Sequence, residues 1–435
     1  MTSRRLRLRV WSLLTAATML SAGACTAEKK ADAAGAASPG GVSAPSVGRA
    51  APGVTDDSIK IGVVYPDFSS VKQYLHIDHG DYRATYGALI KKLNDSGGIN
   101  GRKIIPVYGA INVTSPSAAQ ETCVKLTQDE KVFAVIGTLS TNEPLCYVQN
   151  NRTAVVGGPL TTKNYALAKA PWFSTDRGGD ELYDALGLFA AALKGRKVAV
   201  AGVANEQSLV QDTVVPTLKK LGVTPVQVAI SDANPQDAVA TAQQANVFLT
   251  KFQASGADTL VLAGGAAVTF PAALEKTKYR PRLLFTSRDE ANIYAEDNKS
   301  KHDYSTLSDA LTLGTVDQWS ESTVQKCVGT VENAVPKLKG KLGVDPATLP
   351  PGAFAPQIAL TDACTSLNLF GAIAGKAGRK LDYETFQSAG FSLGTFPLPG
   401  KADKADYTEK TPHGAVPFRL FTYDSVTSKF VPSAS

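Results

Sequence analysis

The 435-residue sequence is poor in the side chains that most catalytic and metal sites need. It contains only four histidines and five cysteines, and it has no Gly-x-Ser-x-Gly, P-loop or His-Glu-x-x-His motif. His76 and His79 lie close together with an aspartate between them, but no third metal ligand accompanies them. A polar loop is the favoured interpretation of that segment. We therefore expect no enzymatic activity, no cofactor and no metal site.

A strong charge of one sign is also lacking. The formal net charge is +6, and four of these charges belong to arginines within the first nine residues. The rest of the chain carries only a small positive excess, spread along the sequence as on a solvated surface. Such a balance argues against nucleic acid as a partner.

Long hydrophobic runs are absent beyond the N-terminus. Residues 10–20 form an apolar stretch that is too short for a permanent membrane helix, which needs about 20 residues. The arginines come before it, and small residues followed by Cys25 come after it. This order predicts a signal peptide over residues 1–24 and resembles a bacterial lipobox, with lipid attached to Cys25. The alternative is ordinary secretion with Cys25 as a free thiol.

The segment after Cys25 has little capacity to build a core. Residues 26–53 are mostly Ala, Gly, Ser and Pro, so we expect residues 25–53 to be the lipidated cysteine and a flexible linker. The remaining chain, roughly 380 residues, is long enough for two domains of ordinary size.

Four cysteines remain after Cys25, and an even number in an exported chain favours disulfides. Three pairings are open, and the most local one joins Cys123 with Cys146 and Cys327 with Cys364. A four-cysteine zinc site is the alternative, but no Cys-x-x-Cys pair supports it.

Strands and helices alternate along the body of the chain. Residues 59–64 form a short β-branched run typical of a buried parallel strand, and residues 82–93 place apolar side chains at helical spacing. A second series of the same kind begins near residue 197. After about residue 311 the pattern changes to helices at 323–338 and 357–374, and a last strand is predicted at 418–423. Two such series predict an α/β protein with two doubly wound parallel-sheet lobes.

Three segments carry a resemblance to a known family. Residues 54–62, 93–104 and 131–137 together resemble the leucine/isoleucine/valine-binding family of type I periplasmic binding proteins. The resemblance implies two lobes joined by three crossing segments at a hinge, with ligand held between them. It implies an N-terminal lobe of residues 54–176 and 312–395, and a C-terminal lobe of residues 177–311 and 396–435. It also supports the Cys123–Cys146 pairing.

The candidate binding residues follow the predicted strands, because ligands sit beyond the carboxyl ends of strands in open α/β sheets. Ser140 and Thr141 follow the third strand, and Thr161 and Thr162 follow the fourth. Hydroxyls and backbone N–H groups at helix starts suit a carboxylate, and the resemblance implies that these loops hold a ligand's α-carboxylate. Simple helix capping is the alternative role.

The other candidates are Phe68 after the first strand, Gly265 in the second lobe, and an acidic residue, Asp289 or Glu290, for a ligand's ammonium group. The second-lobe loops lack the aromatic side chain that amino-acid binders of the family often place there. The predicted ligand is therefore a small polar solute, an amino acid or a related carboxylate or amide.

Together these observations predict a solute-binding lipoprotein on the extracytoplasmic face of the cell membrane. We expect a monomer, anchored through the lipid on Cys25, that captures its solute by lobe closure and delivers it to an ABC permease. The alternative is a ligand-sensing lipoprotein of the same fold that signals to a membrane partner. A neighbouring permease gene would favour transport, and a neighbouring kinase gene would favour sensing.

Overall fold

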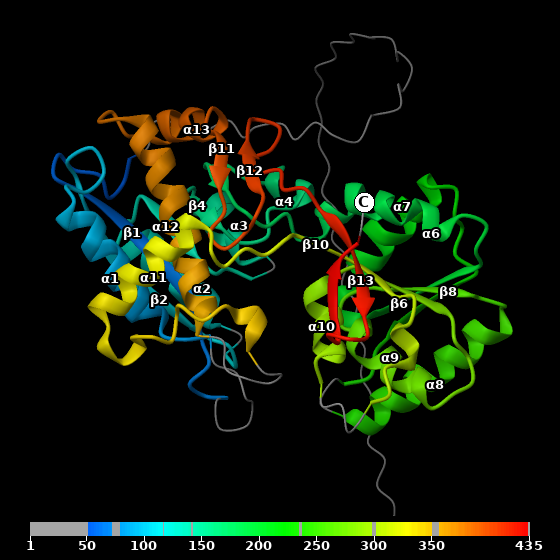
Figure 1. Ribbon diagram of the computed structural model, residues 1–435. Coiled ribbons are helices and arrows are strands. Elements are labelled where there is room, and N and C mark those ends of the chain that lie inside the picture. Colours follow the sequence, from blue (N-terminus) through cyan, green and yellow to red (C-terminus); the bar gives the residue numbers. More distant parts are fainter. Residues whose placement is uncertain are drawn as a thin grey trace, which may run out of the picture. The chain divides into compact units, whose positions relative to one another are not determined.

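A computed structural model describes residues 51–71, 79–115, 117–140, 142–234, 237–297, 302–349 and 356–433. These residues belong to one unit of the chain, residues 41–435, shown in Figure 1. The predicted signal peptide, Cys25 and nearly all of the linker lie outside the described residues, as do His76 and Thr141.

The first sheet has five parallel strands in the order β2-β1-β3-β4-β5. The strands are β1 (Ser58–Asp67), β2 (Lys103–Asn112), β3 (Ala134–Gly137), β4 (Ala154–Gly157) and β5 (Trp172–Phe173). Side chains on both faces of β1 are buried, including Ile61 and Val64. A strand covered on both faces has to be apolar on both, which is why β-branched residues dominate residues 59–64.

Helices cover each face of the first sheet. One face packs against α1 (Tyr82–Asp95), α11 (Ser322–Ala334), α12 (Gln357–Ala377) and α13 (Tyr383–Phe391). The other face carries α2 (Ala118–Val124) and the short helices α3 (Glu143–Leu145) and α4 (Thr162–Tyr165). Asp81 caps α1 by accepting from the backbone N–H of Ala84, which fixes where that helix begins.

The second sheet has seven strands in the order β14-β13-β10-β9-β8-β6-β7. Its parallel strands are β6 (Val198–Val203), β7 (Gln227–Ser231), β8 (Thr259–Leu262), β9 (Arg282–Phe285) and β10 (Leu311–Gly314). The strands β13 (Arg419–Asp424) and β14 (Lys429–Pro432) add an antiparallel edge. The predicted last strand at 418–423 corresponds to β13, whereas the sequence pattern does not predict β14.

Two layers of helices enclose this sheet as well. The first layer contains α5 (Leu182–Ala185), α6 (Ala190–Leu193) and α7 (Val215–Lys220). The second contains α8 (Ala238–Ala254), α9 (Ala266–Glu275) and α10 (Arg288–Ala295). The predicted α/β class with two doubly wound parallel-sheet lobes is confirmed.

The chain passes between the two lobes at three places. It leaves the first lobe after β5, and it returns between β10 and Trp319, which packs in the first core. It leaves again between β12 and β13. The hairpin of β11 (Gly394–Pro397) and β12 (Lys404–Tyr407) packs in the first core through Phe396 and Tyr407.

These crossings differ from the predicted lobe boundaries. Residues 311–314 pair with β9 in the second sheet, and residues 396–407 belong to the first lobe. Sequence resemblance weakens after about residue 300, so the pattern there could not locate the crossings.

Two disulfides join neighbouring elements of the first lobe. Cys123 on α2 pairs with Cys146, which follows α3, and Cys327 on α11 pairs with Cys364 on α12. The most local of the three possible pairings is the one that the structure has. By length and composition α12 would be able to cross a membrane, but more than half of it is buried within the first lobe.

Candidate functional site

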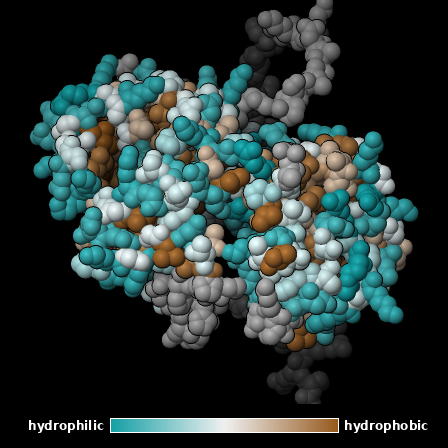
Figure 2. Space-filling model, viewed as in Figure 1, coloured by the Kyte–Doolittle hydropathy of each residue, from teal (hydrophilic) through white to brown (hydrophobic). Residues whose placement is uncertain are grey.

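A cavity of about 840 Å³ lies between the two sheets. Its walls come from the carboxyl ends of β3, β4, β9 and β10, from one side of α12, and from all three crossing segments. Strand ends of both lobes thus meet at one place, as expected for open α/β sheets. Elsewhere, on the face shown in Figure 2, apolar residues lie in small separate groups among polar ones.

Charged side chains of both signs line the cavity wall. The cationic ones are Arg177, Arg288, Lys401 and Lys429, and the carboxylates are Asp176, Glu181, Asp289, Glu296, Asp317, Asp345 and Asp362. A wall with this composition favours a polar, charged solute over an apolar one, because a charge removed from water needs a partner.

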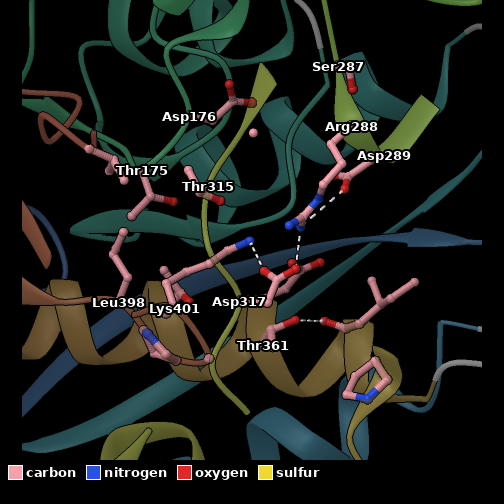
Figure 3. A pocket seen from close by; sticks show the side chains of 18 of the residues that line it. Thr175, Asp176, Ser287, Arg288, Asp289, Thr315, Asp317, Thr361, Leu398 and Lys401 are labelled. Carbon is pink, nitrogen blue, oxygen red and sulfur yellow. Dashed lines mark hydrogen bonds and ion pairs between the residues drawn. The ribbon is translucent and has the colours of Figure 1, made fainter. Parts of the chain in front are cut away.

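One carboxylate joins two of the cations. Lys401 Nζ lies 2.6 Å from Asp317 Oδ1, and Arg288 Nη2 contacts Asp317 Oδ2 (Figure 3). Burial acts to raise the pKa of Asp317, but the two cations outweigh it and hold that pKa below its usual value. Asp317 is therefore ionised throughout the physiological range and forms a stable bridge between the two cations.

The backbone around Asp317 holds this bridge at the hinge. The second crossing segment pairs with the turn after β11, where the N–H of Gln318 donates to Gly400 O (2.8 Å) and the N–H of Ala402 donates to Val316 O (2.9 Å). Asp317 and Lys401 stand opposite each other in this pairing. Arg288, at the first position of α10, reaches the same point from the second lobe.

Acidic groups gather at the first crossing segment. Burial raises the pKa of Glu181 to about 8, and the carboxylates of Asp176 and Asp289 add to this rise. Burial also raises the pKa of Asp176. Glu181 therefore holds a proton at neutral pH, and a cation arriving beside it would favour its ionised form.

The first-lobe wall is a polar stripe on α12. Thr361, Asp362, Thr365 and Ser366 line the cavity from this helix. Asp362 accepts hydrogen bonds from the hydroxyls of Tyr82 (3.0 Å) and Thr138 (2.9 Å), and burial raises its pKa. A half-buried acid held in this way is positioned by its own lobe, and its hydrogen bonds are satisfied without a solute.

Of the predicted binding residues, Asp289 lines the cavity. The strand ends do contribute, through Thr138 and Leu139 after β3 and through Gly157 and Gly158 at the end of β4. Ser140, Thr161, Thr162, Phe68 and Gly265 lie outside the lining, and Thr141 lies outside the described residues.

The outlying candidates have local partners. Thr161 caps α4 by accepting from the N–H of Asn164 (3.2 Å), and the ring of Phe68 packs on His79 with 4.6 Å between ring centres. Their roles in ligand binding remain predictions.

Sequence reasoning did not select Arg288, Asp317, Lys401 or Thr361. Arg288 does stand in a strand-end loop, so the strand-end rule could have found it. Asp317 stands shortly after β10, where the sequence pattern predicted no strand, and Lys401 lies in the turn between β11 and β12. The two meet through the pairing of the second crossing segment with that turn. Within the described residues, no group of three or more His, Cys, Asp or Glu side chains is arranged to hold a metal ion.

Comparison with known proteins identifies the family and the fold. Residues 58–295 match the family described as periplasmic binding protein. The fold is similar to that of a type 1 periplasmic binding protein from Bordetella pertussis Tohama I, with a TM-score of 0.61, 16% identity, and coverage of 87% of this chain and 100% of that one.

Two further structures were solved with bound solutes. One is an ABC transporter substrate-binding protein from Desulfitobacterium hafniense in complex with Leu, with a TM-score of 0.57, 14% identity, and coverage of 87% of this chain and 100% of that one. The other is a solute-binding protein from R. palustris in complex with benzoate, with a TM-score of 0.54, 17% identity, and coverage of 86% and 95%.

A comparison with curated protein sequences finds no significant match. The family match covers more than half of the chain, and the two lobes with three crossings have the architecture that the resemblance implied. The chain therefore belongs to the periplasmic binding protein family and has the type I fold.

Proposed function

We propose that this protein is an extracytoplasmic solute-binding lipoprotein that captures a small polar solute and delivers it to an ABC importer. The solute class is an amino acid or a related carboxylate or amide. The observation that carries the proposal is the charged cavity, to which both lobes and all three crossing segments contribute. A solute that contacts both lobes there would stabilise their closed arrangement over an open one.

The similar structures support the solute class without deciding it. Two of them hold Leu and benzoate as ligands, and both ligands carry a carboxylate. At 14% and 17% identity the likeness to those chains extends to the fold alone. The N-terminal sequence, with its arginines, apolar run and Cys25, supports export and lipid anchoring.

The direct test is a thermal-shift screen of the oxidised, exported domain from residue 26 onward. Amino acids, small carboxylates, amides and sugars are added one at a time. A solute that binds only the folded state raises the melting temperature by mass action, by an amount that grows with its concentration. A rise with one chemical class supports the proposal, provided that the solute is recovered unchanged. Turnover of the solute would point to an enzyme instead.

Anchoring is tested separately. Expression of the whole chain and of a Cys25→Ala variant, followed by membrane fractionation, should place the first in the membrane fraction and release the second. Equal release of both would contradict the lipid anchor and leave solute binding untouched.

A further inference from the structure

Three helix-start N–H groups in or beside the predicted binding loops are already bound by carboxylates of this chain. The backbone N–H of Ser140 donates to Glu143 Oε2 (2.7 Å), and that of Thr162 donates to the carboxylate of Asp180. In the second lobe the N–H of Gly265 donates to Glu206 Oε2 (2.9 Å). These are the positions where an incoming carboxylate would otherwise find electropositive backbone.

The consequence for a charged solute is direct. A carboxylate arriving at any of these three positions would have to displace an internal carboxylate and would be repelled by it meanwhile. The hydroxyl of Thr161 accepts from the backbone of α4 and lies outside the cavity lining. The anionic group of a solute therefore needs another receptor in the cavity.

Arg288 has the structure of such a receptor. Its guanidinium carbon lies 4.7 Å from the centre of the Phe421 ring, and the stem of the side chain passes over Gly314. A Cβ at residue 314 would lie 3.0 Å from the Cβ of Arg288, so the glycine provides the room for this path. The side chain is only 12% exposed and directs its guanidinium towards the centre of the cavity (Figure 3). Packing thus fixes the orientation of a planar donor group before any solute arrives.

Asp317 occupies the place that a solute carboxylate would take. It bridges Arg288 and Lys401, but its side chain remains 46% exposed, and that of Lys401 is 35% exposed. Two cations share one carboxylate here, and the second carboxylate beside Arg288, that of Asp289, is 3.9 Å away and 90% exposed. A solute anion can therefore reach both cations from the open part of the cavity.

We propose that Arg288 and Lys401 form the subsite that binds the carboxylate of the solute, and that Asp317 is the internal carboxylate with which the solute competes. This inference rests on the proposed function and specifies it, because it makes a carboxylate the required group of the solute. It also predicts that replacing Arg288 and replacing Asp317 change the affinity for the solute in opposite directions.

Isothermal titration of the wild-type domain and three variants tests this assignment. The probes are L-leucine, benzoate and 4-hydroxybenzoate, each titrated beside its carboxamide. Arg288→Gln should weaken carboxylate binding roughly 30-fold or more, because a desolvated charge pair with the solute is lost. Asp317→Asn should strengthen it by about tenfold, since the internal competitor is removed. Carboxamides should bind the wild-type protein far more weakly than carboxylates.

Arg419→Gln is the matched control. Arg419 forms an ion pair with Asp403 at 2.9 Å and likewise connects β13 with a first-lobe segment, but it does not line the cavity. We expect no change in affinity for this variant. Lys401→Gln, at a more exposed position, gives a second variant if Arg288→Gln unfolds, and it should also weaken carboxylate binding.

The outcomes separate the inference from the proposed function. If Arg288→Gln binds a carboxylate as well as the wild type does, or if Asp317→Asn weakens binding as Arg288→Gln does, the pair is a structural tie and the inference fails while solute binding stands. Binding of carboxamides or sugars in place of carboxylates would likewise contradict the inference and leave solute binding standing. A wild-type protein that binds no solute in either screen contradicts both.

Discussion

The hydroxyl of Tyr407 donates to the backbone carbonyl of Ser174 across 2.8 Å, and both residues are buried. This bond ties the first crossing segment to β12, and the N–H of Ser174 donates to Pro412 O (3.1 Å) on the approach to the third crossing. The first and third crossings are thus held together by specific polar contacts.

Tyr407→Phe should lower the free energy of unfolding by about 1–3 kcal/mol, because a buried carbonyl loses its partner. Tyr183→Phe is the control, since its hydroxyl also donates to a backbone carbonyl, that of Asp212, but from an exposed ring. That change should cost well under 1 kcal/mol, roughly the effect of a surface substitution. Chemical denaturation measures the free energy of unfolding of both variants. An equal decrease in the two would contradict the buried role of the Tyr407 hydroxyl.

Removal of the Cys327–Cys364 disulfide should destabilise the first lobe. The bond closes a loop with a sequence separation of 37 residues. In the chain-entropy view, loss of such a loop costs about 3–4 kcal/mol. The measurement is denaturation of the Cys327→Ala, Cys364→Ala double variant, and alkylation of the exported wild-type domain without reduction should label none of its four cysteines.

Glu181 should make stability depend on pH. Burial raises its pKa from 4.5 to about 8, so the folded state holds a proton that the unfolded state releases between these values. The unfolded state binds fewer protons there, and the contribution of Glu181 to stability is therefore present below pH 4.5 and is lost as the pH rises through about 8.

Glu181→Gln removes this titration. The variant should gain stability over the wild type as the pH rises from about 5 to 9, by on the order of 2–5 kcal/mol at the upper end. Glu409→Gln, at an exposed position, should show no such trend. A melting-temperature difference that stays constant with pH would contradict the raised pKa of Glu181.

The strand-end hydroxyls give a graded comparison with Arg288. Ser140→Ala combined with Thr161→Ala should weaken solute binding at most about two- to fivefold without unfolding the protein, because both hydroxyls lie outside the cavity lining and a neutral hydroxyl contributes less than a charge pair. Isothermal titration of the double variant with the same carboxylates measures the change in affinity. A loss larger than that of Arg288→Gln would restore these loops as the principal carboxylate site, and unchanged affinity would remove them from the site.

Sequence patterns predicted the strands whose cause is local. The β-branched run of β1 has to be apolar on both faces, and the helical spacing over residues 82–93 gives α1. The hairpin of β11 and β12 was not predicted, because the proline-rich segment around it has no clear alternation and its stability comes from packing in the first core.

Part of the site could not be predicted either, because it depends on contacts between segments far apart in the sequence. Asp289 could be predicted from its strand-end position, whereas Lys401 and Asp317 are 84 residues apart and meet only through the pairing of the second crossing segment with the turn between β11 and β12. Two predicted loops are changed as binding sites by internal hydrogen bonds, from the N–H of Ser140 to Glu143 and from that of Thr162 to Asp180. No sequence pattern predicts these hydrogen bonds.

The late return of the chain to the second sheet constrains the order of assembly. That sheet is completed by β13 and β14, which follow the whole hairpin of β11 and β12 in the first lobe. An emerging polypeptide can therefore finish neither lobe independently, because each requires residues made after most of the other. Such long-range pairing is slow to form. During export both lobes should remain incomplete until the last strands are added. Until then β10 is an unpaired sheet edge, and we expect proteases and chaperones to act on the chain there.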